Sequence, residues 1–428
     1  MSFFSEILKN TAALFALCLL AGCTGATHIK ALSKDSNNNY SESDKLLIAS
    51  LKKQSDDLHI ELKKRGLIYS DKESNEYISS LGRNLAPEFM TGGNVLKFYI
   101  IKDATANAMA LPNNNIYLNI GLLAVVESEA QLATILAHEI SHVIQQHSLK
   151  SRLNRQETIL AANIADIFLL GTGLSYLPAI SNISSFSREQ EKDADLLGLK
   201  HLRNAGYDLN QAPDVFKVFQ TLPEVTTIEG SAYSSHPQNK QRIELIEKVV
   251  NEQYTGYNPH HKESEAFTKI RKKVVETHVK IRLHNNQYEL ALNTLDKAEA
   301  YYSKAALIQF YRAEAFRLKA DNPRKAAEEI KWLYPEFQET KNIEYFIKNK
   351  PANYQKAESL YNDAIKMNPN LSLSYRGNGL LNYSNNNYTA ALSNLNKYLE
   401  LNKKPEDSLY IKRLIRNINR KLGSKHND

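Results

Sequence analysis

The stretch QLATILAHEISHVIQQH, residues 131–147, decides how the rest of the chain is interpreted. Its apolar side chains recur at spacings of three and four residues, which is the period of one face of an α-helix. These side chains are Leu132, Ile135, Leu136, Ile140 and Val143. The sequence therefore predicts a helix whose apolar face turns toward a core.

The same stretch contains the motif H-E-x-x-H at His138, Glu139 and His142. Histidines four residues apart lie one turn apart on a helix and project the same way, so both imidazoles can bind one zinc ion at about 2.0–2.1 Å. Glu139 would then stand beside the ion as the general base for a water molecule. The alternative interpretation is two surface histidines beside an ordinary glutamate, since short motifs also arise by chance.

The composition is that of a soluble, basic protein. Its 428 residues leave room for two or three domains, and a hydrophobic content of 42% is ordinary. The formal net charge of +7 suggests attraction to anionic surfaces, including lipid headgroups. Because the Lys and Arg residues are scattered along the chain, no nucleic-acid partner is expected.

The N-terminus predicts export and lipid attachment. Residues 12–20 form an apolar run that is too short to span a bilayer but suits a secretory signal. The run LAGC that ends at Cys23 resembles the processing site of bacterial lipoproteins, which implies cleavage before Cys23 and a lipid on its thiol. Thr24, rather than Asp, follows, so we expect a periplasmic protein anchored at the outer membrane. The alternatives are an uncleaved anchor and an ordinary signal peptide cut nearby.

Two helices and two strands are predicted ahead of the motif. The helices are predicted near residues 43–65 and 75–85, and the sequence KFYII predicts a strand at Lys97–Ile101. A second strand is predicted at Ile116–Ile120, where apolar and polar residues alternate, and residues 107–115 between the strands are expected to form a turn. The free edge of this second strand could hold an extended peptide beside the metal, or the strand could only complete a sheet.

Residues Ile159–Ile180 are mostly apolar over a length that could span a bilayer. Asp166 near the middle, the break at Gly171-Thr172-Gly173 and Pro178 count against a membrane helix, because a carboxylate in lipid is costly. We therefore expect a helical hairpin or lid over the active-site groove.

A hydrolytic zinc site needs a third protein ligand and one open position. The metzincin pattern H-E-x-x-H-x-x-G-x-x-H is excluded, because Gln145 and Ser148 stand where it requires Gly and His. The ligand must therefore come from another helix. Residues 187–198, SREQEKDADLLG, form a helical segment that is rich in carboxylates.

This segment offers two carboxylate pairs at i, i+4 spacing, Glu189 with Asp193 and Glu191 with Asp195. The second pair is preferred because small or apolar residues such as Ala194 accompany its face, which must pack on the metal helix. We expect Glu191 to bind zinc and Asp195 to accept the ring N–H of a histidine ligand, which fixes the tautomer of that ring. The alternative is that these acids form a solvated surface.

Three segments together, HEISHVIQQHS, FSREQEKDADLLG and SSHPQNKQRI, resemble the periplasmic zinc metallopeptidases of the BepA (YfgC) type, relatives of the membrane protease HtpX. The resemblance covers most of the chain, from about Leu67 onward. It implies a zinc endopeptidase that degrades misfolded or stalled outer-membrane proteins at their assembly machinery. The family's functional positions are matched by His138, Glu139, His142, Glu191 and Asp195.

The resemblance also assigns a role to one further histidine. In that family a histidine in an H-P loop can sit over the zinc and close the resting site, so His236 is a candidate switch ligand. Arg242 matches a family position without a definite role. The family usually has Pro-Gly-Gly where this chain has Pro112-Asn113-Asn114. Because asparagine tolerates positive φ better than most residues, we expect the turn to persist.

The C-terminal third contains a repeat of 34 residues, the period of tetratricopeptide (TPR) units. The repeated positions are Tyr354, Ala357, Tyr361 and Ala364, and then Tyr388, Ala391, Leu395 and Tyr398. An earlier copy begins at Tyr288, and residues 309–330 form a degenerate one. Stacked helix pairs of this kind form a concave surface that binds extended segments of other proteins. A generic helical domain with tyrosines in its core is the alternative.

The sequence as a whole predicts a predominantly helical α+β protein. We expect a signal peptide at 1–22, a flexible tether at 23–42, a gluzincin-like zinc metallopeptidase domain with a small β-sheet at 43–262, and an all-α TPR solenoid at 263–428. One Zn²⁺ per chain is expected, with unfolded or misfolded proteins as substrates and the outer-membrane β-barrel assembly machinery as a partner of the repeats. The alternative is a chaperone or scaffold lipoprotein that acts through its repeats, with a closed or vestigial metal site.

Overall fold

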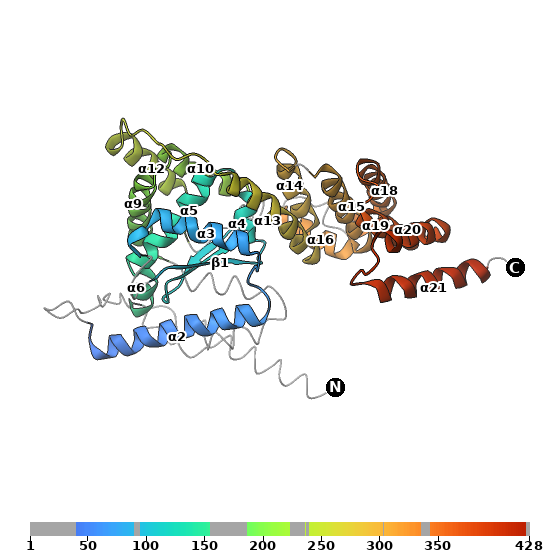
Figure 1. The fold of residues 1–428 in the computed structure, drawn as a ribbon, viewed down its shortest axis with the longest axis horizontal. Helices are drawn as coiled ribbons and strands as arrows, with labels where there is room; N and C mark the ends of the chain where they lie inside the picture. Colours follow the sequence, from blue (N-terminus) through green and yellow to red (C-terminus); the bar gives the residue numbers. More distant parts are fainter. Residues whose placement is uncertain are drawn as a thin grey trace.

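The computed structural model describes residues 40–89, 95–154, 186–222, 236, 239–302, 304–334 and 343–424. Within them the chain is mostly helical with one small sheet, as the sequence predicts (Figure 1). The signal peptide and lipid site predicted at the N-terminus, and the apolar segment at 159–180, lie outside the described residues. In the described part, no helix combines the length and the apolar composition needed to cross a bilayer.

The first part of the chain surrounds the sheet with helices. Its elements are α2 (Glu42–Lys64), α3 (Lys72–Leu85), the 3-10 helix η1 (Pro87–Phe89), β1 (Lys97–Ile101), β2 (Ala108–Ala110), β3 (Asn115–Asn119), α4 (Ile120–Val125), α5 (Glu129–Ile144), α6 (His147–Asn154), α9 (Arg188–Asn204), the 3-10 helix η4 (Leu209–Gln211), α10 (Ala212–Gln220) and α12 (Asn239–Gln253). Both helices predicted before the sheet are present as α2 and α3.

The sheet has the strand order β1-β3-β2, in which β3 pairs in parallel with β1 and antiparallel with β2. β1 has the predicted bounds, whereas β3 starts and ends one residue earlier than predicted. The idea that the strand at 116–120 offers a free edge is wrong, because β3 is the central strand. The segment expected to be only a turn supplies β2, which covers that edge.

The turn between β2 and β3 keeps the form that the sequence predicts. Asn114 has a φ of 64°, in the left-handed region that asparagine tolerates. Its amide donates to the carbonyl of Leu111 at 3.1 Å, which closes the turn. An asparagine can therefore replace glycine in this turn.

Helix α5 lies at the centre of the first core. Leu132, Ile135, Leu136 and Ile140 are no more than 1% exposed and share a core with β1 and β3. The helix also packs on α9, α10 and α3, so it is surrounded rather than buried on one face only. This position excludes water from any polar group that α5 carries in its middle.

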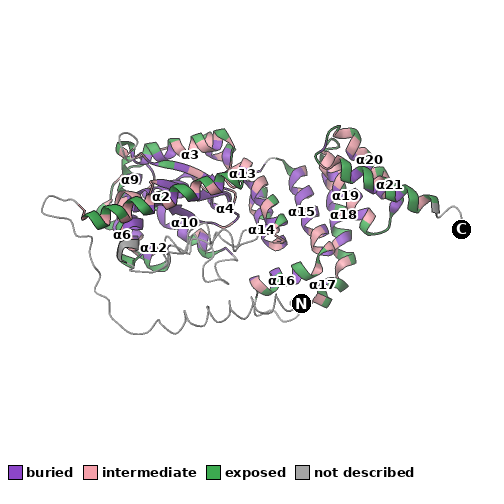
Figure 2. Cartoon of the chain, turned by 90° about the horizontal axis from the view of Figure 1, so that it is seen from below, coloured by how far each residue is buried: buried purple, intermediate pink, exposed green. Residues whose placement is uncertain are grey.

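The second part of the chain consists of helices that pack in pairs. They are α13 (Glu265–His284), α14 (Tyr288–Glu299), α15 (Ala305–Asp321), α16 (Pro323–Leu333), α17 (Ile343–Lys348), α18 (Lys350–Met367), α19 (Ser372–Ser384), α20 (Tyr388–Leu401) and α21 (Ser408–Ser424). The repeated positions on α18 and on α20 are all buried. Figure 2 shows these helices together with the exposed faces of α2 and α21.

Two turns of the C-terminal part repeat the same local structure. Asn286 and Asn386 have φ values of 59° and 60°, and each side-chain oxygen accepts a hydrogen bond from the tyrosine two residues later. The distances are 2.9 Å from Tyr288 and 2.7 Å from Tyr388. The sequences NNQY and NNNY thus form equivalent turns between paired helices.

Helix α13 joins the two parts. Phe267, Ile270 and Val274 belong to the core around α5, whereas Val279 and Leu283 belong to the core of the C-terminal helices. The division between a domain at 43–262 and another at 263–428 therefore falls just before a helix that both cores share.

Candidate metal centre

Helix α5 carries the motif residues in its last two turns. The helix begins at a Ser128 cap, whose side chain accepts a hydrogen bond from the amide of Gln131. His138, Glu139 and His142 are each no more than 2% exposed. The interpretation of these histidines as surface residues is therefore excluded.

Helix α9 brings the carboxylates to α5. It starts with a capping box in which Ser187 and Gln190 satisfy each other's backbone amides. Glu191 and Asp195 are 3% and 4% exposed, whereas Glu189 and Asp193 face solvent. The pair that the sequence analysis preferred is thus the pair that packs against the metal helix.

The close approach of α9 to α5 depends on a small residue. A Cβ placed on Gly198 would lie 3.4 Å from the backbone nitrogen of His138, so the two helix backbones are nearly in contact. Ala194 on the same face is fully buried. These two small residues let the longer Glu191 and Asp195 reach the histidines from the neighbouring helix.

The motif histidines and Glu191 converge on one point. Nε2 of His138 lies 2.9 Å from Nε2 of His142. Oε2 of Glu191 lies 3.4 Å from Nε2 of His138, and Oε1 of Glu191 lies 3.5 Å from Nε2 of His142. Two nitrogens bound about 2.0–2.1 Å from one tetrahedral ion would stand about 3.3 Å apart, close to the separation found here.

His236 occupies the remaining side of the cluster. Its Nδ1 lies 2.8 Å from Oε1 of Glu191 and 3.1 Å from Nε2 of His138, and its Nε2 lies 3.2 Å from Oε1 of Glu139. Burial alone would lower the pKa of His236, but the carboxylates of Glu191 and Glu139 outweigh it and raise this pKa to about 9. His236 thus contacts both the expected metal ligands and the expected general base.

Asp195 contacts the ring nitrogen of His138 that faces away from the cluster, and Arg242 holds Asp195 in place. Oδ1 of Asp195 lies 2.9 Å from Nδ1 of His138, and Arg242 donates to both Asp195 oxygens at 2.7 and 2.9 Å. Burial opposes the charge on Asp195, but Arg242 and His138 together lower its pKa. The guanidinium of Arg242 also lies 4.4 Å from the ring centroid of Phe216, which fixes its plane.

Two residues of the site were not singled out by the sequence analysis. Nδ1 of His147 lies 2.9 Å from Nδ1 of His142, and the ring of Phe186 stacks on His142 with centroids 3.8 Å apart. Burial lowers the pKa of His147 to about 4 and that of His142 well below its usual range, so both are neutral near pH 7. The only sequence signal for His147 was its position two residues beyond Gln145, the C-cap of α5.

The donor set suits zinc. His138, His142, Glu191 and His236 each offer one ligand atom, and these four atoms all lie within 4.8 Å of one another. Zinc in proteins prefers imidazole nitrogen and carboxylate oxygen in a four-coordinate arrangement. The neutral ring of His142, the ionised carboxylate of Glu191 and the supporting Asp195–Arg242 pair provide the protonation states and the surroundings that such an ion requires.

Comparison with known proteins agrees with this geometry. Residues 72–250 match peptidase family M48. The chain is 29% identical over 188 residues to the putative beta-barrel assembly-enhancing protease of Vibrio cholerae, covering 41% of this chain and 39% of that protein. It is 31% identical over 166 residues to the mitochondrial metalloendopeptidase OMA1 of Schizosaccharomyces pombe, covering 36% of this chain and 47% of that protein.

The region 72–250 is therefore a domain of peptidase family M48, a class of metallopeptidases, with its metal-site residues intact. Within that family the chain is distantly related to the beta-barrel assembly-enhancing proteases, including that of Escherichia coli at 24% identity over 188 residues, and to OMA1. The chain spans about two fifths of the length of the beta-barrel assembly-enhancing proteases that it matches.

Proposed function

We propose that this protein is a zinc-dependent endopeptidase in which His138, His142 and Glu191 hold the metal. The observation that carries the proposal is the meeting of these three side chains, from two helices, inside a fully buried site. A bound zinc ion would act as a Lewis acid that polarises a peptide carbonyl and makes a water molecule more acidic. Casein-like or unfolded chains, rather than folded domains, are the expected substrates.

Glu139 would transfer the protons, and Asp195 and Arg242 would hold the site in position for it. Oε1 of Glu139 lies 3.2 Å from Nε2 of His236, so its carboxylate faces the same site, where it can accept a proton from water and pass it to the leaving amine. Asp195 accepts from the ring of His138 and keeps its other nitrogen directed at the cluster. Arg242 neutralises Asp195 and contacts Glu191 at 3.2 Å, which holds both carboxylates in place.

His236 would close the resting site and would act as a switch ligand. Its contacts with Glu139 and Glu191 support this role, because a substrate carbonyl or a water molecule would have to occupy the same space. For catalysis the ring must therefore leave, which frees the carboxylate of Glu139. This proposal rests on the position of His236 in the buried cluster.

The names of the relatives and the N-terminal sequence support a proposal for substrate class and location. The Escherichia coli relative is named as a beta-barrel assembly-enhancing protease, and the Vibrio cholerae relative as a putative one. We propose a lipid anchor at Cys23, a periplasmic location at the outer membrane, and a role in the quality control of outer-membrane proteins. The paired C-terminal helices, with their equivalent Asn286 and Asn386 turns, would be TPR units that bind substrate or the assembly machinery.

A comparison of wild type with His236→Ala separates a gated protease from a scaffold. Purified protein should contain about one zinc per chain and should cleave casein or an unfolded porin, and His236→Ala should cleave several-fold faster. Zinc with no cleavage by either protein would favour the scaffold lipoprotein. Failure to bind zinc would contradict the metal site itself.

A further inference from the structure

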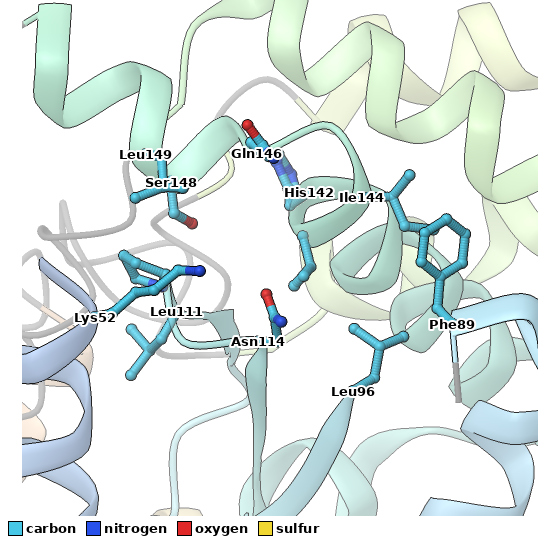
Figure 3. A pocket seen from close by; sticks show the side chains of 12 residues that line it. Lys52, Phe89, Leu96, Leu111, Asn114, His142, Ile144, Gln146, Ser148 and Leu149 are labelled. Carbon is cyan, nitrogen blue, oxygen red and sulfur yellow. The ribbon is translucent and has the colours of Figure 1, made fainter. Parts of the chain in front are cut away.

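A small cavity adjoins the metal cluster on the side of helix α2 (Figure 3). Its volume is about 150 Å³, and His142 forms part of its wall. A water molecule takes up about 30 Å³, so the space fits one side chain rather than a folded segment. The other walls come from α2, η1, the β2–β3 turn, the end of α5 and the start of α6.

The walls of this cavity are of two kinds. Phe89, Leu96, Leu111 and Leu149 supply apolar surface, and Leu111 and Leu149 lie on the same side as Lys52 and Ser148 (Figure 3). Lys52, Asn114, Gln146 and Ser148 supply the polar groups. Among the described residues that line the cavity, none is an aspartate or a glutamate and one is a lysine, so these residues together carry a positive charge. An apolar wall with a cationic end matches an aliphatic stem that ends in an anion.

Lys52 provides the cationic end. It is half-buried on α2, and its ammonium group points into the space between Ser148 and Asn114 (Figure 3). Among the described residues, no carboxylate forms an ion pair with it within 4.0 Å. The acid one turn further along α2, Asp56, accepts a hydrogen bond from Asn113 at 2.8 Å. The ammonium of Lys52 thus faces the cavity without a carboxylate partner among the described residues.

The polar groups beside Lys52 are held in fixed positions. The Ser148 hydroxyl donates to the carbonyl of Ala110 at 2.8 Å, which ties α6 to the edge strand β2. Gln146 has a φ of 55° and accepts a hydrogen bond from Tyr40, just ahead of α2. These contacts connect α2 to the end of the metal helix and define the cavity from both sides.

We propose that this cavity is a specificity pocket of the peptidase, in which Lys52 binds a carboxylate of the substrate next to the scissile bond. The inference rests on the proposed function, since it assigns a substrate preference to that same site. Helix α2 lies outside residues 72–250, so the pocket is completed by a part of the chain beyond the M48 region. Lys52 is thus a specificity-determining residue of this chain and not part of the metal machinery.

A carboxylate beside the scissile bond has two sources. It can be the side chain of a glutamate, whose stem would lie on Leu111 and Leu149, or the free C-terminus of a short peptide. Both would pair with the same ammonium group. Peptides with free and with amidated C-termini distinguish the two, because amidation removes only the terminal carboxylate.

The test is the cleavage of a mixed peptide library by the full mature chain, with the residues around every cleaved bond identified by mass spectrometry. Wild type should show an enrichment of glutamate at one fixed position, and kcat/KM for a peptide with Glu there should exceed that for its Gln counterpart by about tenfold. Lys52→Gln should abolish this ratio, and Lys52→Glu should invert it in favour of Lys or Arg.

Lys53→Glu is the matched control. Lys53 lies next along α2, is exposed, and pairs with Asp57 at 2.8 Å on the outer surface, so its reversal should leave the preference unchanged. Cleavage that requires a free C-terminus and shows no glutamate enrichment would assign the carboxylate to the chain terminus. Cleavage by wild type without any carboxylate preference, or with a preference that survives Lys52→Glu, would overturn the inference and leave the peptidase intact. Absence of cleavage by all variants would overturn both.

Discussion

Arg242 donates to Asp195 from two nitrogens, at 2.7 Å from Nη2 to Oδ1 and at 2.9 Å from Nε to Oδ2. Asp195 in turn lies 2.9 Å from the ring nitrogen of His138 that faces away from the cluster. A residue of α12 thus fixes a carboxylate of α9, and that carboxylate fixes an imidazole of α5. This order assigns the arginine a positioning role.

Arg242→Gln should therefore weaken zinc binding by about 10–100-fold, because the groups that orient metal ligands have effects of this size. The measurement is a zinc titration in competition with a chelator. Lys192→Gln, on the exposed face of α9, is the matched control and should bind zinc as wild type does. Equal zinc affinity in the Arg242 variant would show that Asp195 needs no partner.

The stability of the C-terminal helices should depend on pH through Glu329. Its carboxylate accepts from the backbone amides of Tyr288, Glu289 and Leu290 at 2.7, 2.9 and 3.2 Å, at the start of α14. Burial raises its pKa to about 7 despite these hydrogen bonds. Between its ordinary pKa of 4.5 and about 7, the folded state keeps a proton that the unfolded chain releases.

The free energy of unfolding should therefore fall as pH rises from 4.5 to 7, by on the order of 3 kcal/mol from this group. The sole tryptophan, Trp332, lies on the same helix as Glu329 and reports unfolding by fluorescence in urea. Glu329→Gln should remove this slope. Glu328→Gln, at an exposed position paired with Lys325, should retain it. A slope that persists without Glu329 would contradict the assignment.

The pairing of α19 with α20 should depend on Gly379. A Cβ at this position would lie 2.7 Å from a methyl carbon of Leu395, which is too close without movement. Gly379→Ala should destabilise the helix pair by about 1–3 kcal/mol, as overpacking does. Gly423→Ala on α21, where nothing lies within 4 Å, should be neutral or slightly stabilising. Similar melting temperatures for the two variants would contradict close packing at this glycine.

The sequence predicted the parts of the site that depend on local spacing. His138 and His142 share a helix face because they are four residues apart, and Glu191 was separated from Glu189 because small residues accompany its face. The central place of β3 was not predicted, because β2 has only three residues, with no alternation to reveal it. His147 was missed for a similar reason: its contact with His142 depends on the Gln146 turn, with a φ of 55°.

The position of Lys52 could not be read from the sequence either. Nothing in α2 distinguishes this lysine from the adjacent Lys53 or from Lys63 near the end of the helix, since all three belong to a polar helix. Only the packing of α2 near α6 brings one of them to the cavity beside His142. Contacts between distant segments thus decide which polar residues of a surface helix reach the site.

The central claim is that Glu139 transfers protons in a zinc peptidase. The most direct test compares cleavage of an unfolded porin by wild type and by Glu139→Gln, each loaded with zinc. The variant should retain about one zinc per chain, because Glu139 is not one of the proposed ligands, and should lose cleavage by a factor of at least about 100. Undiminished cleavage by zinc-loaded Glu139→Gln would contradict the mechanism.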